Sequence, residues 1–151
     1  MRYGESDTAA ARALARLRRH RYGAVVERLT EEPSFLAKSM FGGMACYLHG
    51  RMMLILIDKR PPWRGLLVLT TRAAQPALVA ELPALGVHPV IAKWLLLPDA
   101  ADDFEETAAR VVELIRADDP RIGVESTPGK SRRRRPRRPA ARPRARARSG
   151  A

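Results

Sequence analysis

The feature that most constrains this chain is its composition from Ser126 onward, which is almost entirely Arg, Pro, Ala, Ser and Gly. Such a segment has almost no apolar surface to bury, and its like charges prevent it from folding against itself. The preceding residues contain the aliphatic and aromatic side chains that a core requires, in a chain that is 46% hydrophobic. We therefore predict one folded domain at residues 1–125 and a disordered basic tail at residues 126–151.

The positive charge of the chain is concentrated in this tail. Of the 28 Lys and Arg residues, Lys130 and ten arginines follow Pro128, whereas all 16 acidic residues precede it. The tail thus has a net charge of +11 and the rest of the chain +1, within a total of +12. The basic positions are Lys130, Arg132, Arg133, Arg134, Arg135, Arg137, Arg138, Arg142, Arg144, Arg146 and Arg148.

Guanidinium groups spaced by Pro and Ala remain available to phosphates. We expect the tail to bind DNA or RNA non-specifically through counterion release, with an affinity that falls steeply as salt rises. A solubilising extension without a selected partner is the alternative. An anionic membrane is less favoured, because no amphipathic apolar face accompanies the charge.

The residues before the tail predict an α+β fold. Apolar residues at helical spacing indicate helices at the two ends of the domain, and short apolar runs between them indicate strands. That order favours a small, mainly antiparallel sheet backed by helices. The expected elements are a helix over 8–29, strands within 35–57 including a buried one at 52–57, a strand over 65–70, a short helix over 76–82, a strand over 93–97 and a helix over 104–115. Residues 87–91 are weakly strand-like, and Pro89 favours an edge strand or a loop there.

Glycine pairs predict the turns of this sheet. Gly42 and Gly43 are adjacent, and His49 precedes Gly50 between two strand-like segments. Glycine supplies the positive φ that a tight turn needs. We interpret Gly42-Gly43 as a tight turn or bulge rather than a phosphate-binding loop, because a strand rather than a helix follows it.

Two motifs resemble the N-terminal domain of the TfoX/Sxy family, which is named for a bacterial regulator of competence genes. The first is Met40-Phe41-Gly42-Gly43 followed by Tyr47, Gly50 and Met52, and the second is Lys93-Trp94-Leu95-Leu96-Leu97-Pro98 before an acidic helix start. The resemblance covers about residues 21–117 and implies a small α+β unit. It supplies structural positions, namely Met40, Phe41, Gly42, Gly43, Tyr47, Gly50, Trp94 and Pro98, and no catalytic residue.

Two segments depart from that family. The stretch Pro61-Pro62-Trp63-Arg64-Gly65 replaces the short turn expected before the third strand, and residues 118–151 do not resemble the helical second domain of the competence regulators. We therefore do not extend competence regulation to this chain.

Cysteine and histidine offer little for catalysis. Cys46 and His49 are three residues apart, and in a strand an odd spacing places side chains on opposite faces. A thiolate nucleophile needs an adjacent base, so a buried structural cysteine and a turn histidine are favoured. The histidines have no metal-ligand spacing and there is one thiol, so we predict no metal, no cofactor and no enzymatic activity.

Two groups of side chains could contact nucleic acid within the domain. Trp63 lies in an arginine-bearing loop and is the better surface candidate for base stacking, whereas Trp94 is expected in the core. The first helix carries arginines that could face nucleic acid, although an ordinary solvated surface is favoured. These are Arg12, Arg16, Arg18, Arg19 and Arg21.

The sequence favours a regulatory or interaction domain tethered to nucleic acid by its tail. The alternative is a protein-interaction adaptor in which the tail is incidental. The single cysteine and the lack of a long apolar run favour a cytoplasmic protein without membrane insertion.

Overall fold

The computed structural model describes residues 2–125, with side chains from Thr8 onward. The predicted tail at residues 126–151 lies outside the described residues. The described part is an α+β fold built on one antiparallel sheet, as the sequence predicted.

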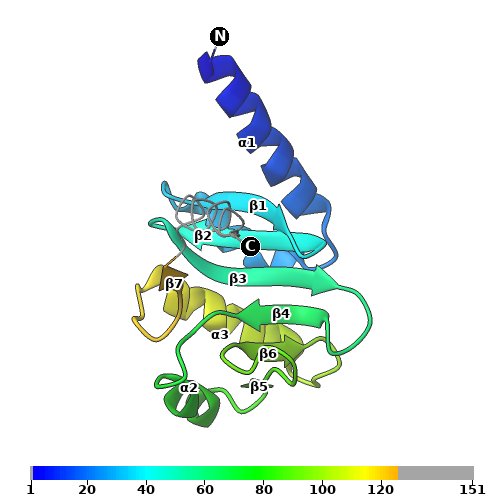
Figure 1. Ribbon diagram of the computed structural model, residues 1–151, viewed down its shortest axis with the longest axis vertical. Coiled ribbons are helices and arrows are strands. Elements are labelled where there is room, and N and C mark those ends of the chain that lie inside the picture. The colour runs from blue at the N-terminus through cyan, green and yellow to red at the C-terminus, as the bar shows by residue number, and fades with distance from the viewer. Residues whose placement is uncertain (1, 126–151) are drawn as a thin grey trace, which may run out of the picture.

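Seven strands form this sheet, in the order β1-β2-β3-β4-β6-β5, with β7 paired to β3 beside β4 (Figure 1). The long central strand β3 pairs with β2 on one side and β4 on the other, and all pairings are antiparallel. The strands are β1 Leu36–Met40, β2 Gly43–Leu48, β3 Arg51–Asp58, β4 Arg64–Val68, β5 Gly86–Val87, β6 Leu95–Pro98 and β7 Val124–Glu125.

Three α-helices and a 3-10 helix accompany the sheet. They are α1 Arg2–Arg19, the 3-10 helix η1 Gly23–Glu31, α2 Gln75–Glu81 and α3 Phe104–Arg116. In Figure 1, α3 lies behind the sheet, and α1 extends beyond β1 away from the body of the domain. The end of α1 is anchored by Leu17, which is 1% exposed.

The single helix predicted over residues 8–29 is wrong. The chain turns after Arg19 and continues as η1 from Gly23. A Cβ atom on Gly23 would lie 2.3 Å from the carbonyl oxygen of Leu17, so the chain passes too close to the end of α1 for a larger residue. A straight helix would carry Val26 and Leu29, both 0% exposed, away from the core.

The two faces of the sheet carry separate apolar clusters because side chains alternate along each strand. On the helix-covered face, Cys46, Leu54 and Leu66 pack with residues of η1 and α3 such as Val26 and Val111. On the opposite face the cluster comprises Ala45, Tyr47, Met52, Ile55, Ile57, Leu67, Leu69 and Trp94, with Trp63 and Ile91 packed against it.

Two-residue turns join β1 to β2 and β2 to β3. The first turn is Phe41-Gly42, with φ of 56° and 76°, and the second is His49-Gly50, with φ of 53° and 76°. Positive φ at both central residues is what a type I′ hairpin requires. The sequence placed the second turn correctly, whereas the first is one residue earlier than Gly42-Gly43.

Other boundaries also differ from the sequence-based prediction. The predicted strand over 93–97 begins only at Leu95, because Trp94 precedes the ladder that pairs β6 with β4. The weakly strand-like stretch over 87–91 contributes only Val87 to a strand, the two-residue β5, and the two-residue β7 was not predicted. The closing helix at Phe104–Arg116 agrees with the prediction to one residue.

Candidate functional site

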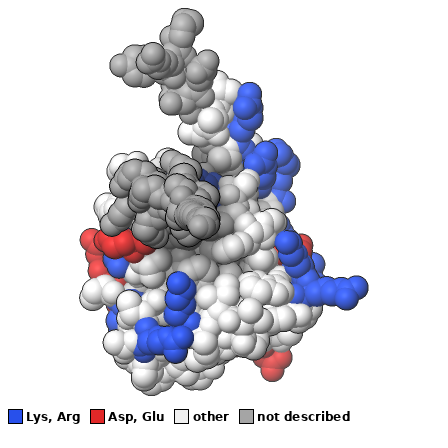
Figure 2. Space-filling view, in the orientation of Figure 1, with Lys and Arg blue, Asp and Glu red and all other residues white. Residues whose placement is uncertain are grey.

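The basic positions predicted to bind nucleic acid, Lys130, Arg132, Arg133, Arg134, Arg135, Arg137, Arg138, Arg142, Arg144, Arg146 and Arg148, all lie outside the described residues. Within the described part, the projecting helix α1 carries a basic surface, seen in blue along α1 in Figure 2. Its arginines are exposed at positions 12, 16, 18 and 19.

Two of these arginines have described partners. Arg16 donates to the Ser39 hydroxyl over 2.7 Å, and Arg18 lies 3.6 Å from a Glu27 carboxylate oxygen. Arg12 and Arg19 have no acidic partner among residues 8–125. The exposed basic surface of α1 thus combines two arginines with described partners and two without an acidic partner in that range.

The family-motif residues form the framework of the sheet. Gly43 opens β2, where a Cβ atom would lie 2.0 Å from the Leu56 carbonyl oxygen, so no side chain fits. Tyr47 is 4% exposed, with the Lys38 ammonium 5.2 Å from its ring centroid. Trp94 is 9% exposed, which confirms its expected place in the core. The remaining positions are Met40 at the end of β1, Phe41 and Gly42 in the first turn, Gly50 in the second, and Pro98 at the end of β6.

Phe41 and Trp63 lie together at one end of the sheet, in the β1–β2 turn and the β3–β4 loop. With Ile57 and Lys59 they line a hollow of about 240 Å³ that opens to solvent. Phe41 is 52% exposed, whereas Trp63 is partly exposed and also packs against the apolar cluster of that face. The hollow therefore combines an apolar floor, two aromatic rings and one ammonium group.

Hydrogen bonds hold the loop that carries Trp63. The Nδ1 atom of His88 accepts hydrogen bonds from the backbone amides of Val90 and Ile91, each at 3.0 Å. The ring hydrogen is therefore on Nε2, which donates to the Pro62 carbonyl over 2.9 Å. The rings of His88 and Trp63 pack with centroids 4.4 Å apart. His88 is 0% exposed, and its hydrogen bonds join its own loop to the β3–β4 loop.

A cluster of titratable groups lies at the same end of the sheet. The Tyr22 hydroxyl donates to Asp99 Oδ2 over 2.7 Å, and Arg64 Nε donates to the same oxygen over 2.9 Å. The hydrogen bond from Tyr22, supported by Arg64, lowers the pKa of Asp99. Burial and the Asp99 contact raise the pKa of Tyr22 to about 12. These shifts follow from pairing, and the cluster fastens the α1–η1 connection to β4 and β6.

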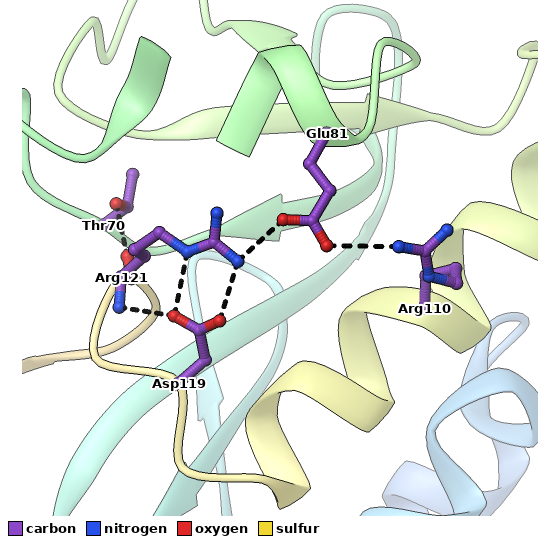
Figure 3. Close-up of polar contacts among 5 residues, drawn as sticks. All are labelled: Thr70, Glu81, Arg110, Asp119 and Arg121. Atoms are coloured by element: carbon purple, nitrogen blue, oxygen red, sulfur yellow. Dashed lines mark hydrogen bonds and ion pairs between the residues drawn. The ribbon is translucent and has the colours of Figure 1, made fainter. Parts of the chain in front are cut away.

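A second ionic cluster fastens the segment after α3 (Figure 3). Arg121 donates to both carboxylate oxygens of Asp119, at 3.0 and 2.7 Å, and lies 2.9 Å from Glu81 in α2. Glu81 also accepts from Arg110 of α3 over 3.1 Å, and the Thr70 hydroxyl donates to the Arg121 carbonyl over 2.6 Å. All groups are paired with one another, so the cluster is a structural clamp.

The hollow beside this clamp does not suit a phosphate. It has a volume of about 410 Å³ and lies between α2 and α3. Its charged lining is Glu81, Asp103, Glu106, Glu113 and Arg110. Four carboxylates against one guanidinium repel an anion.

Cys46 and His49 do not form a catalytic pair. Cys46 is 0% exposed in the core, and burial raises the pKa of its thiol to about 12. His49 lies in a surface turn, where its backbone amide donates to the Ser34 hydroxyl over 2.9 Å. In residues 8–125, no three His, Cys, Asp or Glu side chains gather as metal ligands. No described helix combines the length and apolarity of a membrane span.

Sequence reasoning missed the pairing of Phe41 with Trp63. The signal was present in the meander of β2, β3 and β4, because antiparallel neighbours place the β1–β2 turn and the β3–β4 loop at the same end of the sheet. The partners of Asp99 lie 77 and 35 residues away in the chain, and no local pattern indicates them.

Comparison with models of protein families, with curated proteins and with solved structures finds no match to this chain.

Proposed function

We propose that this chain is a non-enzymatic regulatory or interaction domain that is tethered to DNA or RNA by its basic segment at residues 130–148. The observation that carries the proposal is the division of charge, +11 after Pro128 against +1 before it. A near-neutral domain with such an arm attracts polyanions through the arm, whatever the domain itself binds.

The described residues add two supports. The exposed arginines of α1 supply a second basic surface on an element that extends beyond the sheet. The thiol of Cys46 is sealed in the core, where it is unsuited to act as a nucleophile. The resemblance to the TfoX N-terminal domain implies a small α+β unit, and the described residues form an α+β fold. We keep that resemblance as part of the proposal, together with a cytoplasmic location.

Salt-dependent binding tests the tether. We would titrate the full chain and a chain ending at Thr127 against duplex DNA and single-stranded RNA over a salt series. For the full chain on duplex DNA, the affinity should fall with a log–log slope of up to about 10, because each neutralised phosphate contributes about 0.9. The chain ending at Thr127 should lose most of the affinity and most of the slope.

A matched pair of variants separates charge from sequence. Replacing the ten tail arginines with lysine should retain most of the salt slope, whereas replacing them with glutamine should remove it. Undiminished binding by the chain ending at Thr127 at moderate salt would show that the tail is not the tether.

Exposed apolar residues favour a protein-interaction adaptor as the second candidate function. Val87 and Val90 are 52% and 65% exposed on the β5 loop. Exposed apolar side chains only three residues apart could form part of a contact with another protein. If neither chain binds nucleic acid, the adaptor is the function that the exposed residues support.

A further inference from the structure

Phe41 occupies a position that turn chemistry does not favour. Its φ is 56°, in the left-handed region, where Asn, Asp and Gly are tolerated and a bulky side chain is strained. Burial does not compensate, because Phe41 is 52% exposed. A strained and exposed aromatic residue indicates a requirement other than folding.

Gly42 allows a cation to lie beside this ring. A Cβ atom on Gly42 would lie 2.6 Å from both Cε and Nζ of Lys59, so the lysine crosses the turn where the glycine has no side chain. Lys59 lines the hollow with Phe41, Ile57 and Trp63. An ammonium group is thereby placed at the rim of an aromatic pocket.

Trp63, on the other side of the hollow from Phe41, is held in place by its own loop. The loop that carries Trp63 is closed by backbone hydrogen bonds from Lys59 N to Trp63 O, 2.8 Å, and from Trp63 N to Arg60 O, 2.7 Å. The ring of His88 packs against the Trp63 ring, with centroids 4.4 Å apart, and helps to hold it in place. A ligand that enters would therefore order few side chains, and such preorganisation lowers the cost of binding.

The lining of the hollow selects the chemistry of its ligand. It contains two aromatic rings, an aliphatic floor and one cation, and it contains no acid. Asp58, the nearest carboxylate in the chain, is directed to Arg21 and Arg64, at 3.7 and 3.9 Å. A flat aromatic group joined to an anion fits this arrangement.

We propose that the hollow binds one unpaired nucleobase of single-stranded nucleic acid, against the rings of Phe41 and Trp63, with the Lys59 ammonium on a neighbouring phosphate. The inference rests on the proposed tether and adds that the strand is single, because bases within a duplex are stacked and cannot enter. The tail supplies affinity without regard to sequence, and the hollow distinguishes single strands from duplexes.

Phe41→Asn separates this role from folding. Asparagine is favoured at the first position of a type I′ turn, so the free energy of unfolding should be unchanged or higher. Base–aromatic stacking by one side chain corresponds to a loss of roughly 5- to 150-fold in affinity. We expect such a loss for a short oligothymidylate, and no loss for a duplex of equal length.

Further variants serve as controls, all in the full chain. Phe41→Tyr and Trp63→Phe keep an aromatic face and should retain affinity, whereas Trp63→Ala should not. Leu36→Ala removes an apolar side chain of similar exposure, 49%, on β1 and should leave affinity unchanged. Binding should also quench the fluorescence of Trp63, measured with Trp94→Phe as background.

An oligomer of the same length without bases distinguishes the two proposals. If the tether is correct, the oligomer without bases should still bind the tail. If the hollow binds a base, the affinity of the wild type for this oligomer should be as low as the affinity of Phe41→Asn for oligothymidylate. Equal affinity of the wild type for both oligomers, with unchanged binding by Phe41→Asn, would overturn the base site and leave the tether intact. Loss with Phe41→Asn but not with truncation at Thr127 would support the base site and overturn the tether.

Discussion

Asp99 shows how single residues are used in this domain. Its side chain is 19% exposed and accepts hydrogen bonds from a phenol and a guanidinium, at 2.7 and 2.9 Å. These bonds favour the carboxylate, and its pKa is lowered accordingly. Tyr22 donates one of these hydrogen bonds, and its pKa is raised first by burial and then by the contact with Asp99, where ionisation would place two negative charges together.

The titration of Asp99 predicts a loss of stability in acid. A carboxyl group with a lowered pKa in the folded state stabilises the fold above its unfolded pKa, about 3.9, and this contribution is lost as the pH falls through the folded value. Asp99→Asn should therefore reduce the free energy of unfolding by about 1 kcal/mol at pH 7, and the difference from wild type should shrink below about pH 4. Urea unfolding at a series of pH values measures both quantities.

Tyr22 provides the check at alkaline pH. Its raised pKa means that the folded state favours the neutral phenol, so this contribution is present below pH 10 and is lost as the pH approaches 12. Tyr22→Phe should remove that alkaline loss of stability.

Asp102→Asn, at an exposed carboxylate, is the matched control for Asp99→Asn. An effect on stability as large as that of Asp99→Asn would contradict the assignment of the effect to the cluster of Tyr22, Arg64 and Asp99.

At the scale of elements, the close contact of β2 with β3 explains Gly43. The two strands pair from Met44↔Leu56 to Leu48↔Arg51, and the path of β2 brings Gly43 against the Leu56 carbonyl. A methyl group at 2.0 Å from that oxygen must displace one of the two strands.

Gly43→Ala should consequently destabilise the domain by about 2 kcal/mol or more, although Gly→Ala substitutions in open positions are often stabilising. Gly86→Ala at the start of β5 is the control, because no atom lies within 4 Å of its Cβ position. Urea unfolding of both variants measures the contrast. If both variants had the same free energy of unfolding, β2 and β3 would be able to move apart at Gly43 without loss of stability.

How well each element could be predicted depended on how local its cause is. The His49-Gly50 turn and the helix at Phe104–Arg116 follow from neighbouring residues, and the sequence predicted both. The break between α1 and η1 depends on the contact of Gly23 with Leu17, and helical spacing continues through it. The two-residue strand β7 exists because β3 has unpaired groups at Arg51 and Met52, beyond the end of β4.

At the scale of the whole molecule, some features of the candidate site follow from local sequence and others depend on distant parts of the chain. The basic tail and the surface position of Trp63 are compositional signals that the sequence contains. The approach of Phe41 to Trp63 requires the register of three strands, and the role of His88 depends on two loops meeting. Sequence reasoning therefore found the charges and one aromatic ring, and it missed the pocket between the rings.

The described chain closes its core shortly before the tail. Ile122 is 0% exposed, Arg121 completes the clamp with Glu81, and β7 ends at Glu125. The residues after Thr127 add positive charge and almost no apolar surface. Folding and the proposed tether should thus be separable in this molecule.

Truncation tests that separation. A chain ending at Thr127 should unfold within about 0.5 kcal/mol of the full chain, because residues 128–151 have almost no apolar side chains that a core could use. A chain ending at Ala117 also lacks Arg121 and Ile122 and should lose several kcal/mol, since a buried aliphatic side chain and an ion-pair clamp are removed together. Urea unfolding at moderate salt measures both. A loss of more than about 1 kcal/mol on truncation at Thr127 would mean that the basic segment packs on the domain, and its positive charges would then be partly occupied before any nucleic acid arrives.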